Sequence, residues 1–137
     1  MKKRHVAGLF GLLIPVFIGA ALPGSSPKGD DVSYTNDVTP LLKKYCLPCH
    51  AEENYNPSEL ALDSFALLMK GGKHGEAVKP GEPDESNIIQ KLAESPPFGE
   101  RMPLHSKRKK TTTPPTYLSE DEVRTLATWI SQGARDN

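Results

Sequence analysis

A stripe of apolar side chains marks the first predicted helix. Apolar residues recur at i, i+3, i+4 and i+7 in this segment, as Val38, Leu41, Leu42 and Tyr45. This spacing places all four on one face of a helix. We expect the helix to begin around Asp37 or Thr39, with Pro40 in its first turn, where the missing N–H of proline costs little. The helix runs directly into Cys46.

The same spacing returns near the end of the chain, after an N-terminal cap. Ser119 to Glu122 has the form of a capping box, in which the serine and the glutamate each satisfy a free backbone N–H. The apolar stripe that follows is formed by Val123, Leu126, Ala127 and Ile130, with Trp129 beside it. Gly133 is the expected end of this helix.

Between these two helices, the sequence predicts short helices separated by long loops. One is expected from Ser64 to Met69, ended by Gly71-Gly72. Another is expected from Ser86 to Ala93, ended before Pro96-Pro97. The alternation of β-branched and aromatic residues that is typical of strands is absent. We therefore predict an all-α fold with long irregular loops.

The N-terminus has the composition of an export signal. A basic head precedes an apolar run from Val6 to Leu22 that ends in small residues. We predict a signal peptide over residues 1–21, with an uncleaved membrane anchor as the alternative, because the run is near the short limit for a bilayer span. A Gly-, Ser- and Pro-rich linker over residues 22–33 then leads to one domain over residues 34–137. The domain is expected in the periplasm or elsewhere outside the cytoplasm, with membrane contact only if the segment is uncleaved.

Charge and cysteine content limit the possible partners of the domain and the ways in which it can be stabilised. The chain has 17 basic and 17 acidic residues, and three of the basic ones lie in the predicted signal, so the remainder carries 14 against 17, a net charge of −3. This balance gives no reason to expect a nucleic-acid partner. One dense basic run, Lys107-Arg108-Lys109-Lys110, stands out against it. With only two cysteines, the domain cannot rely on a framework of several disulfides.

The two cysteines belong to the motif Cys46-Leu47-Pro48-Cys49-His50, which is C-x-x-C-H, the pattern of c-type haem attachment. Two thiols on one turn can each bond a different vinyl group of the porphyrin, and the adjacent imidazole can bind the iron. We therefore predict one covalent haem c, held through thioethers from Cys46 and Cys49, with His50 as the proximal iron ligand. Attachment of this kind takes place outside the cytoplasm, in agreement with the predicted signal.

Three other interpretations of the motif stay open. A thioredoxin-like dithiol needs a βαβ setting, and the sequence offers no strands for one. A zinc site needs four ligands, so His74 or His105 would have to join the motif. A disulfide between Cys46 and Cys49 would close too small a loop to stabilise the chain much.

The sixth iron position has four candidates, the thioethers of Met69 and Met102 and the imidazoles of His74 and His105. Met69 lies on a predicted amphipathic helix, so core packing is its expected role. Met102 lies between Arg101 and Pro103 in a loop, where the periodicity gives it no packing role, and we predict it as the distal ligand. His105 is the rival ligand, and an open distal position is the third possibility.

Further motifs extend over nearly all of the predicted domain. They are residues 37–42, Cys46 to His50, residues 60–64, Leu67-Leu68, Gly71-Gly72, residues 78–81, Ser86, Met102-Pro103, Leu118-Ser119, Trp129-Ile130 and Gly133-Ala134. With these residues the chain resembles the planctomycete-type cytochrome c domain, a single-haem, class I-like member of the cytochrome c superfamily. The resemblance implies a cytochrome c fold, in which the N- and C-terminal helices cross around a covalently bound haem. It also implies His50 and Met102 as the axial ligands.

The motif and the resemblance together imply an electron carrier and not an enzyme. With both axial positions filled, electrons would pass by outer-sphere transfer between redox partner proteins. The run of Lys107, Arg108, Lys109 and Lys110, downstream of Met102, would steer an acidic partner, with a merely solvated loop as the alternative. Two other functions stay open: a haem subunit of a larger oxidoreductase, and a peroxidase-like or ligand-sensing haem protein with an open distal site.

Overall fold

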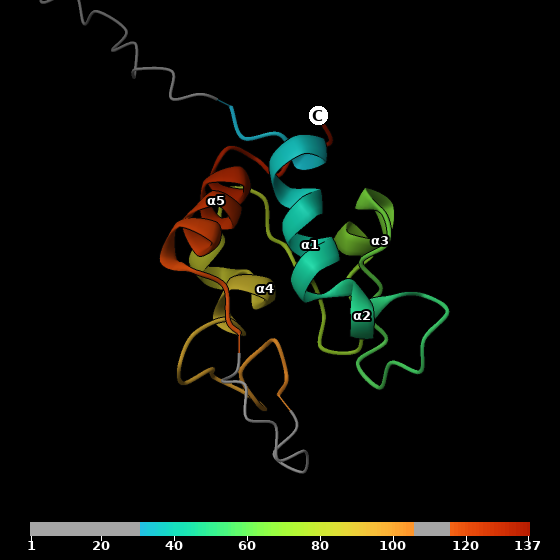
Figure 1. The fold of residues 1–137 in the computed structure, drawn as a ribbon. Helices are drawn as coiled ribbons and strands as arrows, with labels where there is room; N and C mark the ends of the chain where they lie inside the picture. The colour runs from blue at the N-terminus through green and yellow to red at the C-terminus, as the bar shows by residue number, and fades with distance from the viewer. Residues whose placement is uncertain (1–30, 106–115) are drawn as a thin grey trace, which may run out of the picture.

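The fold consists of short helices (Figure 1), and their buried side chains form one apolar core. A computed structural model describes residues 31–105 and 116–137. In chain order, the helices are the π-helix η1 (Tyr34–Val38), α1 (Thr39–Tyr45), α2 (Leu47–His50), α3 (Phe65–Lys70), the 3₁₀-helix η2 (Pro83–Glu85), α4 (Asn87–Gln90) and α5 (Glu120–Ser131). The described residues contain no β-strand, only an isolated bridge between Gly72 and Gly75. The predicted all-α class is confirmed for this part of the chain.

The first predicted helix forms, and a helical turn that the sequence did not predict precedes it. Helix α1 begins at Thr39 with Pro40 in its first turn, as expected, and the π-helix η1 extends helical structure back to Tyr34. Ser33 explains the early start, because its hydroxyl accepts a hydrogen bond from the Asn36 N–H at 3.2 Å and its own N–H donates to the Asp37 carboxylate at 2.8 Å. The predicted stripe faces the core, with Val38 and Leu42 buried and Leu41 and Tyr45 half-buried.

The last helix confirms the predicted capping box. The Ser119 hydroxyl accepts from the Glu122 N–H at 3.2 Å, and the Glu122 carboxylate accepts from the Ser119 N–H at 2.8 Å. The helix ends before Gly133, whose φ of 98° favours glycine. Trp129, expected beside the apolar stripe, instead lies within the core with 1 % of its surface exposed. Its indole N–H donates to the Arg135 carbonyl at 2.9 Å, so the ring is buried without an unpaired donor.

Helix α3 agrees with its prediction. It begins after Ser64, whose hydroxyl accepts from the Leu67 N–H at 3.3 Å, and it ends at Gly71, where φ is 74°. Leu68 is fully buried, and Met69 is half-buried against the core, which is the packing role expected for it.

Helix α4 is shorter than predicted. The sequence predicted a helix from Ser86 to Ala93, whereas α4 ends at Gln90. The carbonyl groups beyond that point accept hydrogen bonds from a later loop, Lys91 from the Met102 N–H at 2.8 Å and Leu92 from the Arg101 side chain at 2.9 Å. The N–H groups of Leu92 and Ala93 bond three residues back, to the Ile89 carbonyl at 3.0 Å and the Gln90 carbonyl at 3.4 Å, so the last expected turn is not α-helical.

Aromatic side chains from three helices meet in the core. The ring centroids of Tyr34 and Phe65 are 5.2 Å apart, those of Tyr34 and Trp129 5.5 Å, and those of Phe65 and Trp129 6.4 Å. Two of these pairs are edge-to-face, the geometry that the charge distribution of aromatic rings favours. The trio therefore joins the first helix, α3 and α5.

Asn137 connects the two ends of the described domain, which lie side by side in Figure 1. Its carbonyl accepts from the Thr35 N–H at 3.0 Å and from the Ser33 hydroxyl at 2.9 Å. Its side chain accepts from the Tyr34 N–H at 2.9 Å. Ser33, placed in the linker by the sequence, thus contacts the C-terminal end of the chain.

A carboxylate on α5 also binds the end of α1. Glu122 accepts hydrogen bonds from the Tyr45 hydroxyl at 2.9 Å and from the Lys44 ammonium at 3.1 Å. The pKa of Glu122 falls to about 2, chiefly because the Ser119 N–H stabilises the charged form, with smaller contributions from Tyr45 and Lys44. One ionised side chain therefore caps α5 and links it to the helix that precedes the cysteine motif.

Two predicted features lie outside the described residues. They are the signal or anchor over residues 1–21 and the basic run over residues 107–110. Among the residues that are described, none of the helices has the length and apolar character needed to span a bilayer.

Candidate haem site

The C-x-x-C-H motif occupies a tight helical turn directly after α1. Cys46 follows the last residue of α1, and its carbonyl accepts from the N–H groups of Cys49 at 3.0 Å and His50 at 2.9 Å. This turn is α2, which the sequence pattern missed because four residues are too few to show a helical period. Pro48 lies in its first turn, where no backbone donor is needed. Both cysteines and the histidine therefore lie within about one turn.

The two thiols have different surroundings. Cys46 is half-buried, Cys49 is exposed, and neither is in a disulfide. Burial raises the pKa of the Cys46 thiol to about 11, with the neighbouring Cys49 as a smaller cause. At neutral pH Cys46 is therefore a protonated thiol, which is a weak nucleophile. The turn presents one sheltered sulfur and one accessible sulfur.

His50 has a fixed orientation. Its Nδ1 atom lies 3.0 Å from the carbonyl oxygen of Leu60. A carbonyl can only accept, so Nδ1 carries the proton and the neutral ring keeps a lone pair on Nε2. Imidazoles that bind metals are commonly held in this way by a backbone carbonyl on the other ring nitrogen. The sequence predicted His50 as a ligand but gave no sign of Leu60, because a backbone carbonyl has no side-chain signature.

The Leu60 carbonyl is itself held in place by the loop after α2. It also accepts from the side-chain amide of Asn56, and the Asn56 side-chain oxygen accepts from the Ser58 hydroxyl at 2.6 Å. The Leu62 N–H returns to the His50 carbonyl at 2.9 Å. The loop therefore contacts the histidine through both its ring and its backbone.

Gly72, in the segment that follows α3, packs closely against this loop. A Cβ atom at Gly72 would lie 2.6 Å from the Ser58 carbonyl oxygen and 2.9 Å from the Cβ atom of Leu60. Real Cβ atoms do not approach backbone so closely, so only glycine fits here. The resemblance included Gly71-Gly72 as a motif, and the structure shows the packing reason for the second of these glycines.

The residues of the motif fit a covalently attached haem. Two free thiols lie on one turn, as two thioether bonds to one porphyrin require. The adjacent imidazole has its Nδ1 proton engaged and Nε2 left for iron. Leu47 within the motif and Leu60 next to His50 are half-buried apolar side chains, so apolar surface is partly exposed there. These features meet the needs of a large apolar cofactor with a central metal.

Met102, the predicted distal ligand, is half-buried in the loop that follows α4. Its backbone N–H donates to the Lys91 carbonyl at 2.8 Å. His105, the rival, packs its ring edge-to-face on Tyr117 with 4.9 Å between centroids. Its Nε2 atom is buried and has no hydrogen-bond partner within the described part of the protein. The choice between Met102 and His105 stays a prediction.

The competing interpretations of the motif gain no support from the described residues. In residues 31–105 and 116–137, no three His, Cys, Asp or Glu side chains are grouped so that they could hold a metal ion, as the zinc interpretation would need. Cys46 and Cys49 are not bonded to each other. The same stretches of chain have no strand for a thioredoxin-like βαβ unit.

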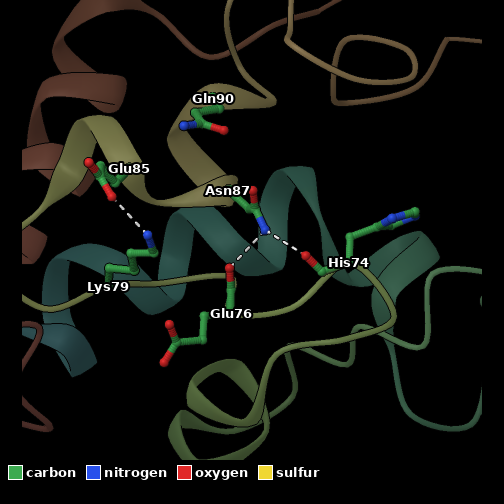
Figure 2. Close-up of a pocket in the computed structure, with 6 residues that line it drawn as sticks. All are labelled: His74, Glu76, Lys79, Glu85, Asn87 and Gln90. Atoms are coloured by element: carbon green, nitrogen blue, oxygen red, sulfur yellow. Dashed lines mark hydrogen bonds and ion pairs between the residues drawn. The ribbon is translucent and has the colours of Figure 1, made fainter.

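A polar hollow of about 450 Å³ lies elsewhere on the surface (Figure 2). Its lining side chains are His74, Glu76, Lys79, Glu85, Asn87 and Gln90. Lys79 and Glu85 form an ion pair at 2.8 Å, and the Asn87 amide donates to the backbone carbonyls of His74 and Glu76 at 3.1 and 2.9 Å. The hollow is open and polar and the predicted ligands do not line it, so it is not the haem site.

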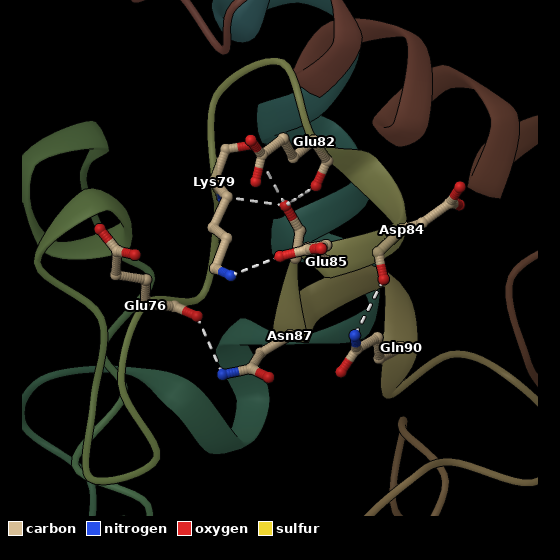
Figure 3. A network of polar contacts seen from close by, with 8 residues as sticks. Glu76, Lys79, Glu82, Asp84, Glu85, Asn87 and Gln90 are labelled. Carbon is tan, nitrogen blue, oxygen red and sulfur yellow. Dashed lines mark hydrogen bonds and ion pairs between the residues drawn. The ribbon is translucent and has the colours of Figure 1, made fainter.

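The loop around this hollow is fixed by a polar network (Figure 3). The hydroxyl of Ser86, a fully buried residue, accepts from the Lys79 N–H at 2.9 Å and donates to the Glu82 carbonyl at 2.9 Å. The Gly81 N–H donates to the Ile130 carbonyl at 2.8 Å. These contacts connect the segment before α4 to α5 and so position α4.

Comparison with known proteins supports one family. No curated protein and no solved structure matches the chain. The model of the family described as Planctomycete cytochrome C matches residues 46–103, which begin at the first cysteine of the motif and end at Met102-Pro103. Residues 46–103 therefore match the planctomycete cytochrome C family, and the predicted resemblance is confirmed over this segment.

Proposed function

We propose that this protein is an exported, single-haem c-type cytochrome that carries electrons between redox partners. The observation that carries the proposal is the contact of His50 Nδ1 with the Leu60 carbonyl, beside two free thiols on one turn. Haem bound here would supply a one-electron ferric–ferrous couple. The family match of residues 46–103 supports the same chemistry.

Each residue of the site has a distinct role in this proposal. Cys46 and Cys49 hold the cofactor covalently, which stabilises a small domain without a disulfide framework. His50 binds the iron through Nε2, and the Leu60 carbonyl keeps the ring in the required tautomer. Met102 would supply a thioether as the second protein ligand, which raises the reduction potential relative to a second histidine. With His50 and Met102 both as ligands, the residues would hold the haem for electron transfer and not for chemistry on a bound substrate.

The distal ligand is tested by substitution in the haem-loaded protein. The oxidised wild type should show the weak near-infrared sulfur-to-iron band, and Met102→Ala should abolish it and lower the potential. Met69→Ala is the matched control, because Met69 packs half-buried on the core and its loss should leave the band unchanged. A spectrum that changes in His105→Ala and not in Met102→Ala would assign the ligand to His105.

We also propose that the partner is acidic and docks near Lys107, Arg108, Lys109 and Lys110. Attraction between opposite charges speeds association and weakens as salt screens it. The test is the rate of electron transfer to the native partner as ionic strength rises. Wild type should slow with salt, and a variant with all four residues changed to Ser should be slower and flatter. Superimposable curves would leave the run as a solvated loop.

Export is proposed from the N-terminal signal. If residues 1–21 are removed, the intact mass of the native protein should correspond to a chain that begins near Leu22, and the protein should fractionate as soluble. A mass that includes Met1, with the haem in the membrane fraction, would favour the uncleaved anchor.

A further inference from the structure

The loop that carries Met102 is closed on itself by three contacts. The Met102 N–H donates to the Lys91 carbonyl at 2.8 Å, and the Lys91 ammonium donates to the Phe98 carbonyl at 2.6 Å. Arg101 Nε donates to the Leu92 carbonyl at 2.9 Å. Lys91 and Leu92, the two residues that follow α4, therefore contact the chain again at Phe98, Arg101 and Met102.

Arg101 makes a second contact in a different direction. Its guanidinium carbon lies 4.0 Å from the ring centroid of Tyr117, which leads into α5. Arg101 thus donates from Nε to the Leu92 carbonyl while its guanidinium lies over an aromatic ring. Arginine can do both because its donors lie in the plane of the group and its faces are weakly hydrated. One side chain therefore joins the end of α4 to the start of α5.

Tyr117 also contacts the chain on the other side of Met102. The ring of His105 packs edge-to-face on Tyr117 with 4.9 Å between centroids. Residues 102–104 are thus bracketed by Arg101 and His105, and both flanking side chains rest on one tyrosine. The residue after Tyr117, Leu118, is buried in the core, which fixes the tyrosine in turn.

We propose that Arg101 and Tyr117 are positioning residues for Met102, which hold its thioether where it can bind the iron. The inference rests on the assignment of Met102 as distal ligand. A loop that is fixed in advance loses little conformational freedom when its side chain binds, whereas a free loop must be ordered at a cost in free energy. The contacts of Arg101 with Leu92 and Tyr117 thus favour the iron-bound state of Met102, although Arg101 itself does not touch the cofactor.

The test uses the haem-loaded protein with Arg101→Gln and Arg101→Lys. Lysine keeps the charge but lacks the planar Nε–H, so both variants should open the loop. Loss of one charge-assisted hydrogen bond corresponds to a factor of about ten in a local equilibrium. We expect a weaker near-infrared sulfur-to-iron band and about tenfold more carbon monoxide binding to the ferrous protein. Arg124→Gln is the matched control, since Arg124 forms an exposed ion pair with Asp121 on α5, and it should behave as wild type.

Tyr117 provides an independent arm if the Arg101 variants fail to fold. Tyr117→Leu should weaken the band, and Tyr117→Phe, which keeps the ring, should restore it. A wild type without the band would refute Met102 as ligand and the inference with it. A wild type with the band, unchanged in Arg101→Gln, Arg101→Lys and Tyr117→Leu, would overturn the inference alone. Loss of the band in Arg101→Gln but not in Arg101→Lys would also overturn the inference. The charge of Arg101, and not its contacts with Leu92 and Tyr117, would then be responsible.

Discussion

Substituting Gly72 by alanine tests how the loop after α2 orients His50, the proposed proximal ligand. The new Cβ atom would lie 2.6 Å from the Ser58 carbonyl oxygen and 2.9 Å from both the backbone nitrogen and the Cβ atom of Leu60. Two of these three are backbone atoms, which cannot move aside as a flexible side chain can, so the segment at Leu60 must shift. Overpacking of this kind costs about 1–3 kcal/mol. If the Leu60 carbonyl also moves away from His50 Nδ1, the lost hydrogen bond adds about 0.5–1.5 kcal/mol.

The assay is thermal unfolding of the haem-loaded protein, together with the electron paramagnetic resonance spectrum of its ferric form. We expect Gly72→Ala to lower the free energy of unfolding by about 2–4 kcal/mol. We also expect a changed spectrum, because the orientation of the axial imidazole depends on the Leu60 contact. Gly81→Ala is the control, since Gly81 has a φ of 84° with open space around it. Alanine there should cost about 1–2 kcal/mol of backbone strain and leave the spectrum unchanged. A Gly72→Ala protein with wild-type stability and spectrum would refute the proposed support of His50.

Two further predictions concern the supports around α5 and α4. Because the pKa of Glu122 is about 2 in the folded protein, below its ordinary value, its contribution to stability is present above about pH 5 and is lost as the pH falls toward 2. In acid-unfolding curves, Glu122→Gln should therefore lose less stability than wild type over this range. Glu120→Gln, in the same turn, should follow wild type. Parallel curves for wild type and both variants would contradict the low pKa of Glu122. Ser86→Ala should cost about 1–3 kcal/mol in denaturant unfolding, because the Lys79 N–H and the Glu82 carbonyl lose a buried partner. Ser131→Ala, at an exposed position on α5, should be near neutral, and an equal effect of both serine variants would show that burial at Ser86 contributes nothing.

The helices that the sequence predicted well are those with both a periodic stripe and an end signal. Ser64 and Ser119 cap the helices that follow them, and Gly71 and Gly133 have the positive φ angles that end them. These features depend on neighbouring residues alone. The spacing of C-x-x-C-H is also local, so the predicted motif residues fall on one turn.

The features that the sequence did not reveal depend on contacts between distant residues. Helix α4 stops at Gln90, and the Lys91 and Leu92 carbonyls beyond it bind the distant loop around Met102. The His50 orientation depends on a backbone carbonyl at Leu60, and backbone groups are the same in every residue. The contact of Arg101 with Tyr117 joins segments on either side of residues 106–115, so no short pattern contains it. Trp129 can be buried in the core because the carbonyl of Arg135, six residues later, accepts a hydrogen bond from its indole N–H.

The central claim is that this chain carries a haem through covalent bonds from Cys46 and Cys49. The most direct measurement is acid–acetone extraction of the protein produced in a host with a c-type maturation system, followed by an absorption spectrum of the protein fraction. The haem should stay with the wild-type chain, and Cys46→Ala and Cys49→Ala should each yield much less haem-loaded protein because one thioether is missing. A colourless wild-type protein, or haem that passes entirely into the solvent, would contradict it.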